Sequence, residues 1–262
     1  IKNGFYEVIN FPFTANEEKK SISIDNPLDS NRNNLRTSLK NSLLENLLYN
    51  ERRQKDSIKF FEISDMYTKS DQINQEKKLG IIISGRQGHN YLDFSKKLDH
   101  AYLSNLLNQD SNNSFFTIEE ISRTELKTKK KDKIFYTEIS IENVPQFIFK
   151  NTESSLEEIN FIKYQSVSEF PFSTRDFSFS ITDINKYDEV INHLSDLNHK
   201  NLNDAFIFDF YENKQLNEIK VGIRFVFQST FNTLSEDEIQ QSVNKLLKPI
   251  VELEGVSIPG LD

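Results

Sequence analysis

The side chains that most often carry out catalysis or bind metal ions are scarce in this 262-residue chain. Cysteine is absent, and the four histidines, His89, His100, His193 and His199, form no HxxxH pair. No glycine-rich phosphate-binding loop occurs. The lack of cysteine excludes disulfides, thiolate metal sites and a cysteine nucleophile. We therefore expect no metal site and no catalytic residue in this chain.

Polar side chains alternate with aromatic ones in three segments, residues 175–181, 205–211 and 221–227. Alternation with period two is typical of a β-strand that buries one face. We predict that the apolar members face the core: Phe177, Phe179, Ile181, Phe206, Phe208, Phe210, Ile223, Phe225 and Phe227. The predicted outward set is Asp176, Ser178, Ser180, Ile207, Asp209, Tyr211, Gly222, Arg224, Val226 and Gln228.

The outward set contains groups that can hold an unpaired nucleic-acid base. Single-stranded RNA is recognised by stacking on aromatic or guanidinium planes and by hydrogen bonds to base edges. Tyr211 and Arg224 are our candidates for stacking on such a base or bonding to it. Ser178, Ser180 and Asp209 are candidates for contacts with base edges.

Two further arginines have competing interpretations. Arg175 is a candidate for RNA contact, but its neighbour Asp176 and the nearby acids favour a structural ion pair. Arg36 lies at the start of a predicted helix, where a cation opposes the helix dipole. That cost indicates a specific partner, and we favour a buried ion pair or a subunit contact over a ligand contact.

Charge is distributed unevenly along the chain. Residues 1–164 hold 24 basic and 24 acidic side chains, whereas residues 165–262 hold 8 and 16, which accounts for the whole net charge of −8. Phosphate neutralisation supplies most non-specific nucleic-acid affinity, so RNA contacts in the acidic part must rely on local geometry and stacking. The one basic cluster, Lys127–Lys133, favours a solvated hairpin tip, with RNA phosphate contact as the alternative.

Apolar patterning in the first part predicts a mixture of strands and helices. Leucines between Leu35 and Leu48 form one helical stripe, capped at Asn33 or Asn34. A second helix is predicted over 94–107. Strands are predicted over 4–11, 21–24, 58–63, 79–84, 115–125 and 133–141, and the apolar run 79–84 is expected to be central in a sheet.

The last hundred residues predict the order strand, helix, strand, strand, helix, strand. Helices are expected over 186–197 and from Ser235, where Glu238 completes a capping box. A short fourth strand is expected at Val256–Ile258. This order is the ferredoxin-like arrangement. We therefore predict an α+β chain with two domains, residues 1–163 and 164–262.

Three motifs in the second domain resemble the ferredoxin-fold anticodon-binding domain of phenylalanyl-tRNA synthetase β chains. Glu169–Asp176 contains the FPxxxRD opening of that family, Phe208–Tyr211 its FDxY strand and Thr233–Glu238 its TL[ST]xxE helix start. Their order and their expected elements make the combination specific.

The first domain resembles the class II synthetase-like module of the same β chains. Gly4–Val8 is similar to the GxxEV strand of the module, and Asp25–Leu28 followed by Leu35–Leu39 is similar to its NPLS…LRTSL segment. Phe61–Ile63 resembles its FEIG strand, with Ser64 in place of glycine. Because the chain starts at Ile1 without a Met and without a basic-then-apolar leader, we expect it to be a fragment. The resemblance implies the C-terminal part of a bacterial β chain.

The resemblance implies a non-catalytic part of a phenylalanine–tRNA ligase, built from two α and two β subunits. The α subunit would use ATP and Mg²⁺, and this chain would hold no cofactor. The module lacks the class II arginine after residues 58–67, where Thr68 and Lys69 follow, and lysine cannot reproduce a guanidinium fork. The implied partners are the α subunit and tRNA(Phe), in the cytoplasm.

Two other classes of function stay open at the level of sequence. The same modules could form a free-standing RNA-binding protein, or a regulatory protein that senses a metabolite, because a ferredoxin-like fold hosts many functions. No apolar run approaches the roughly 20 residues that a bilayer span requires, so we expect no membrane contact.

Overall fold

The computed structural model describes residues 3–15, 20–27, 29, 32–107, 116–126, 128–144, 166–183, 186–195 and 200–259. The chain divides into two compact units. The first comprises Ile1–Gln87 and Lys97–Glu157, and the second comprises Gly88–Lys96 and Glu158–Asp262. The predicted domain boundary between residues 163 and 164 lies outside the described residues.

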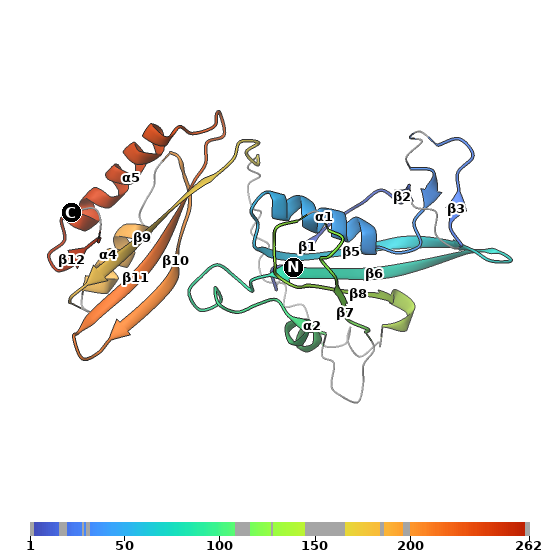
Figure 1. Ribbon diagram of the computed structural model, residues 1–262, viewed down its shortest axis with the longest axis horizontal. Coiled ribbons are helices and arrows are strands. Elements are labelled where there is room, and N and C mark those ends of the chain that lie inside the picture. Colours follow the sequence, from blue (N-terminus) through green and yellow to red (C-terminus); the bar gives the residue numbers. More distant parts are fainter. Residues whose placement is uncertain are drawn as a thin grey trace, which may run out of the picture. The chain divides into compact units, whose positions relative to one another are not determined.

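A five-stranded sheet forms the centre of the first unit, in the order β1-β5-β6-β8-β7 (Figure 1). Its strands are β1 (Tyr6–Glu7), β5 (Ser57–Lys69), β6 (Ile73–Gly85), β7 (Glu119–Ile121) and β8 (Ile134–Ser140). β1 runs parallel to β5, and the other neighbours are antiparallel. The predicted central position of the apolar run 79–84 is confirmed, because β6 is the third of the five strands.

Both faces of this sheet are covered. Helix α1 (Lys40–Arg52) packs Leu43 and Leu47 against one face, and helix α2 (His100–Leu106) packs Leu103 against Ile81 and Ile83 on the other (Figure 1). A short 3₁₀ helix, η1 (Ile141–Asn143), follows β8. A small second sheet contains β2 (Phe13–Thr14), β4 (Asn34–Leu35) and β3 (Ile22–Ser23), in that order.

The leucine-rich helix starts later than its apolar stripe predicts. Asn34 and Leu35 belong to β4, and α1 begins at Lys40 without a side-chain cap. Asn34 is buried and accepts a hydrogen bond from the Ser23 hydroxyl group across the small sheet. Pairing on both sides of β4 thus overrides the local helical pattern. The second predicted helix, 94–107, also begins late, at His100, where Asp99 caps the Tyr102 N–H group.

Glu138 of β8 joins α1 to the sheet. Its carboxylate accepts hydrogen bonds from the Tyr136 hydroxyl group at 2.5 Å, the Leu39 N–H group at 2.7 Å and the Lys78 ammonium group at 2.9 Å. Burial by itself would raise the pKa of Glu138, but these donors outweigh it and hold that pKa below its ordinary value. The charged carboxylate is therefore the form that stabilises the fold.

Lowering the pH should weaken the first unit through Glu138. A depressed folded-state pKa means that the unfolded chain binds more protons, so this contribution is complete above the ordinary glutamate pKa of about 4.3 and is lost as the pH falls through the folded value. Glu138→Gln should lower the free energy of unfolding at neutral pH and reduce its dependence on acidic pH. Urea unfolding at a series of pH values measures both effects. The exposed Glu120→Gln is the control, and an identical pH dependence in the two variants would contradict this role.

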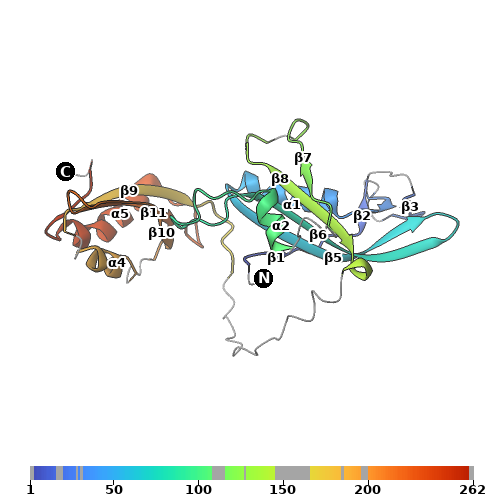
Figure 2. The same cartoon turned by 90° about the horizontal axis from the view of Figure 1, so that it is seen from below.

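The second unit has the predicted ferredoxin-like order, βαββαβ. Its elements are β9 (Ser173–Ile181), α4 (Tyr187–Ser195), β10 (Leu202–Asn213), β11 (Glu218–Phe227), α5 (Glu236–Val251) and β12 (Val256–Ser257). The strands lie in the order β10-β11-β9-β12, and both helices cover one face (Figure 2). The predicted capping box is confirmed, because Ser235 and Glu238 bond reciprocally at the start of α5.

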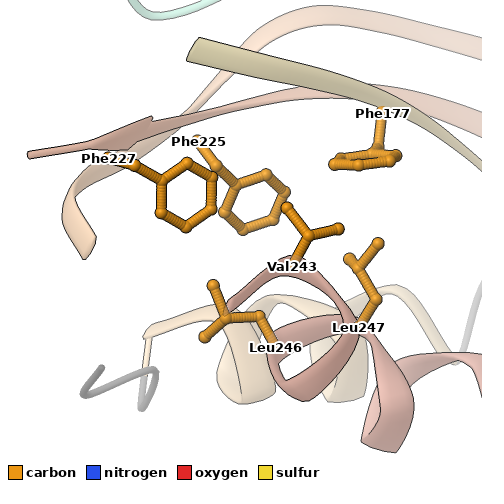
Figure 3. Close-up of a pocket in the computed structure, with 6 residues that line it drawn as sticks. All are labelled: Phe177, Phe225, Phe227, Val243, Leu246 and Leu247. Atoms are coloured by element: carbon orange, nitrogen blue, oxygen red, sulfur yellow. The ribbon is translucent and has the colours of Figure 1, made fainter. Parts of the chain in front are cut away.

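Aromatic rings fill the space between this sheet and α5. Figure 3 shows the side chains on the two sides of the core: Phe177, Phe225 and Phe227 from β9 and β11, and Val243, Leu246 and Leu247 from α5. The gap between them leaves no room for a water molecule. Phe225 and Phe227 are almost completely buried and stack with ring centroids 6.4 Å apart. Close packing of this kind makes the core sensitive to loss of a ring.

Strand β10 departs from the predicted alternation. Its register with β11 shifts between Ile207 and Asp209, so that one extra residue, Phe208, bulges from the ladder. Before the shift Ile207 packs on the core, and after it Phe210 does so. The prediction that Phe206 and Phe208 face the core and Ile207 faces outward is therefore wrong. A bulge reverses which alternate residues reach each face.

Candidate nucleic-acid interface

The face of the sheet turned away from α4 and α5 carries the candidate residues in cross-strand rows. Pairing aligns Phe206, Arg224 and Asp176 in one row. The next row contains Asp209, Gly222 and Ser178, and the third contains Tyr211, Lys220 and Ser180. Directly paired residues point to the same side of a sheet. The structure therefore brings five of the six candidates, all except Arg175, together on one surface, which we call the outer face.

Arg224 is already engaged within the outer face. Its Nε and Nη2 atoms each donate to a different carboxylate oxygen of Asp176 at 2.7 Å. Its guanidinium group also lies over the Phe208 ring, 5.3 Å from the centroid. Gly222 makes this possible, because a Cβ atom at that position would approach the tip of the Phe208 ring to 2.9 Å. The planar guanidinium group of Arg224 and the Phe208 ring are therefore already engaged in contacts within the protein.

The segment Gly88–Lys96, which belongs to the second unit, packs along β10 and contacts residues of both faces of this strand. Three of its aromatic side chains meet the phenylalanines of β10: His89 on Phe206, Phe94 on Phe208 and Tyr91 on Phe210, with centroids 4.7, 5.7 and 5.3 Å apart. The Arg224 guanidinium group lies 5.9 Å from the centroid of the Phe94 ring. An incoming base would have to displace these rings to stack on Phe208.

The row at the other end of the outer face is open. The Tyr211 side chain is 57% exposed, and the neighbouring Lys220 side chain is 54% exposed. Ser180 donates to Glu218 at 2.5 Å, which fixes its hydroxyl group at the edge of this row. Tyr211 thus offers an aromatic plane beside a cation and polar groups. Lys220 was not predicted from the sequence as a site residue. The available signal was its place in an alternating strand, two residues after Glu218 and therefore on the same face.

Arg175 lies apart from the other candidates. It shares the helix-facing side of β9 with Phe177, and its Nη2 atom donates to both carboxylate oxygens of Glu236 at 2.5 Å. Its partner belongs to the first turn of α5. The predicted ion pair is therefore present, with Glu236 as the partner, whereas the neighbouring Asp176 is bonded to Arg224.

Arg36 forms a buried ion pair in the first unit. Arg36 and Glu62 are 4% and 2% exposed, and two guanidinium nitrogens donate to the two carboxylate oxygens at 2.5 and 3.3 Å. Asn10 donates its backbone and side-chain N–H groups to the same carboxylate. Of the interpretations considered for Arg36, the buried structural ion pair is the one that the structure contains.

Among the described residues, no group of three or more His, Cys, Asp or Glu side chains is arranged to hold a metal ion. Within the same ranges, no helix has the length and apolar character needed to cross a membrane.

The ferredoxin-like topology and the outer face belong to the part of the chain that matches a family of anticodon-binding domains. Residues 168–258 match the family described as ferredoxin-fold anticodon binding domain. Residues 1–126 match the family described as phenylalanyl tRNA synthetase beta chain CLM domain. The chain belongs to the phenylalanyl-tRNA synthetase β-chain family, with these two domains in this order.

Similar proteins agree with that assignment. The phenylalanine–tRNA ligase β subunit of Buchnera aphidicola subsp. Schizaphis graminum is 24% identical over 281 residues, which cover 95% of this chain and 35% of the relative. The chloroplastic β subunit of Porphyra purpurea is 26% identical over 284 residues, covering 95% and 39%. The chain therefore spans between a third and two fifths of the length of these relatives. The matches favour the β-chain interpretation over a free-standing RNA-binding or metabolite-sensing protein.

Among solved structures, a pyrrolysyl-tRNA synthetase from Desulfitobacterium hafniense shares 14% identity and a TM-score of 0.38, covering 57% of this chain and 62% of the other.

Proposed function

We propose that this chain contributes tRNA(Phe) binding and subunit assembly to a phenylalanine–tRNA ligase. The observation that supports it most strongly is the open row of the outer face, where the exposed Tyr211 ring lies beside Lys220 and Ser180 on a domain of the anticodon-binding family. A ring of this kind can stack on any unpaired base, and the flanking polar groups can bond to base edges. Because Arg224 is committed to Asp176, Tyr211 is the principal stacking residue in this proposal.

The proposed division of labour leaves the ligase chemistry to an α subunit. ATP and Mg²⁺ would be used there, in a cytoplasmic assembly of two α and two β subunits. Packing in the first unit supports this division. Phe61, Ile81, Ile83 and Phe135 lie in one apolar cluster with α2, and the opposite sheet face is filled by α1. The guanidinium forks of Arg36 and Arg123 in this unit are bonded to carboxylates, those of Glu62 and Glu51.

Replacing Tyr211 with alanine should weaken the complex with tRNA that carries a phenylalanine anticodon. Loss of one stacked base costs about 1–3 kcal/mol, which corresponds to a Kd increase of about 5- to 150-fold. Tyr211→Phe keeps the ring and should stay close to the parent chain. Fluorescence anisotropy with labelled tRNA measures these constants.

The matched control is Tyr49→Ala, which removes a similarly exposed tyrosine from the first unit. The same tRNA with a replaced anticodon is the second control. If Tyr211→Ala and Tyr49→Ala bind both RNAs as tightly as the parent chain does, the outer face does not read the anticodon. If the parent chain discriminates between the RNAs and Tyr211→Ala does not, base stacking at this row is established.

A further inference from the structure

The basic cluster of the first unit lies in the connection between β7 and β8. Lys129 and Lys131 are exposed, and Lys130 between them is half-buried. Among the residues that the structure describes, none of the three forms an ion pair with a carboxylate. Neighbouring lysines behave differently, since Lys133 pairs with Glu120 at 2.9 Å and Lys40 with Glu119 at 2.6 Å. None of these three adjacent cations is thus ion-paired with a described carboxylate, although Lys130 acts electrostatically on Asp132.

A buried ion pair anchors the start of this connection. Arg123 donates to the two carboxylate oxygens of Glu51 at 3.0 and 2.7 Å, and Glu51 is 7% exposed. The Thr128 hydroxyl group donates to the same carboxylate at 3.1 Å and accepts the Lys130 N–H group at 3.2 Å. The backbone that carries the three lysines is therefore tied to helix α1 through Glu51. A freely solvated hairpin tip would need no such anchor.

The other end of the connection is held as well. The Arg123 side chain donates to the Asp132 carbonyl oxygen, and Lys97 donates to the Asp132 carboxylate at 2.7 Å. Burial would raise the pKa of Asp132, but Lys97, Lys130 and Arg123 lower it overall, so this acid stays charged. Its carboxylate is directed to Lys97, which lies outside the cluster. The held backbone presents a local excess of positive charge.

We propose that the loop formed by Thr128–Lys131 contacts the phosphate backbone of bound RNA. Lysine suits this role because it is a compact point charge that neutralises phosphate without reading bases. The anchored backbone reduces the entropy lost when the three side chains engage a polyanion. This inference rests on the proposed function, which supplies the RNA, but it concerns a second surface that does not recognise the anticodon.

The test compares the parent chain with a variant in which Lys129, Lys130 and Lys131 are all replaced by glutamine. Each phosphate contact contributes about 0.7–0.9 to the slope of log Kd against log salt concentration. The triple variant should lose about two units of that slope and bind at least about tenfold more weakly at 50 mM salt. The loss should be equal for tRNA with the phenylalanine anticodon and with a replaced anticodon. The corresponding triple arginine variant should retain binding and slope.

The matched control changes three exposed lysines of the same unit, Lys20, Lys69 and Lys77, to glutamine. It alters the net charge equally, so an equal loss of affinity and slope would reduce the effect to overall charge and overturn the proposal. A triple variant at Lys129–Lys131 that keeps the slope while the parent chain still discriminates between anticodons would overturn the proposal but not the proposed function. No binding of either RNA by the parent chain would overturn both. Loss of α-subunit binding with unchanged RNA binding would assign the loop to a protein partner.

Discussion

Replacing Arg36 with methionine should lower the free energy of unfolding of this chain by about 3–5 kcal/mol. The substitution leaves the Glu62 carboxylate 2% exposed and without its bidentate partner. Hydrogen bonds from Asn10 remain, but they do not neutralise a buried charge. Urea unfolding, with amide exchange of β5 as the local readout, measures the loss.

Two further variants separate the buried charge from the loss of a contact. Arg36→Met combined with Glu62→Leu removes both charges, and it should recover a large part of the stability that the single variant loses. Lys133→Met disrupts the exposed pair with Glu120 and should cost less than about 1 kcal/mol. Similar losses of unfolding free energy for Arg36→Met and Lys133→Met would show that the Arg36–Glu62 pair behaves energetically like an exposed ion pair.

Phe225→Ala should destabilise the second unit by about 3–5 kcal/mol. Phe225 is 1% exposed, and its ring packs edge-to-face on Phe177 with centroids 5.9 Å apart. The space beside α5 already excludes water, so truncation opens a cavity that the neighbouring rings fill only in part. Thermal unfolding followed by near-ultraviolet circular dichroism of the aromatic residues reports on this core.

The matched comparison is Phe208→Ala, which removes the same side chain from the neighbouring strand. Phe208 lies on the outer face and is only partly buried, so its loss should cost less than about 2 kcal/mol. The two variants together test the assignment of faces in β10. Equal losses would mean that Phe208 is a core residue, as strict alternation predicts.

Features determined by short-range sequence were the predictable ones. The Ser235–Glu238 capping box depends on residues three apart, and its geometry follows from the local backbone alone. The order of elements in the second unit is likewise visible in the apolar periods of its segments, because each strand and helix has its own period. The central position of β6 follows from an apolar run that must be covered on both faces.

Features set by tertiary pairing were missed. The Ile207–Asp209 bulge has no signature in the alternating sequence, since every residue from Phe206 to Phe210 fits an unbroken strand. The pairing of Arg224 with Asp176 depends on the register between β11 and β9, which the sequence does not state. Arg175, a candidate for RNA contact, lies on the opposite face from the other candidates, as its place two residues before Phe177 indicates.

The sequence therefore predicted which residues share the candidate site better than it predicted which of them are available to bind a ligand. Tyr211 and Arg224 do share a surface, but Arg224 is bonded to Asp176 and Tyr211 is open. The contacts of the Gly88–Lys96 rings with β10 could not be predicted, because the apolar pattern from Phe94 onward indicates a helix. Side chains far apart in sequence decide which candidate is accessible, and single-strand patterns carry no information about them.

The bulge in β10 also affects the hydrogen-bonding edge of this sheet. β10 is an edge strand, and a regular edge offers unpaired N–H and C=O groups on which a foreign strand can add. Its register shifts at Leu202/Asp204 and Ile207/Asp209 interrupt that template, and Asp204, Asp209 and Glu212 place negative charge along it. The same irregularity that redirects Phe208 thereby protects the sheet from edge-to-edge aggregation.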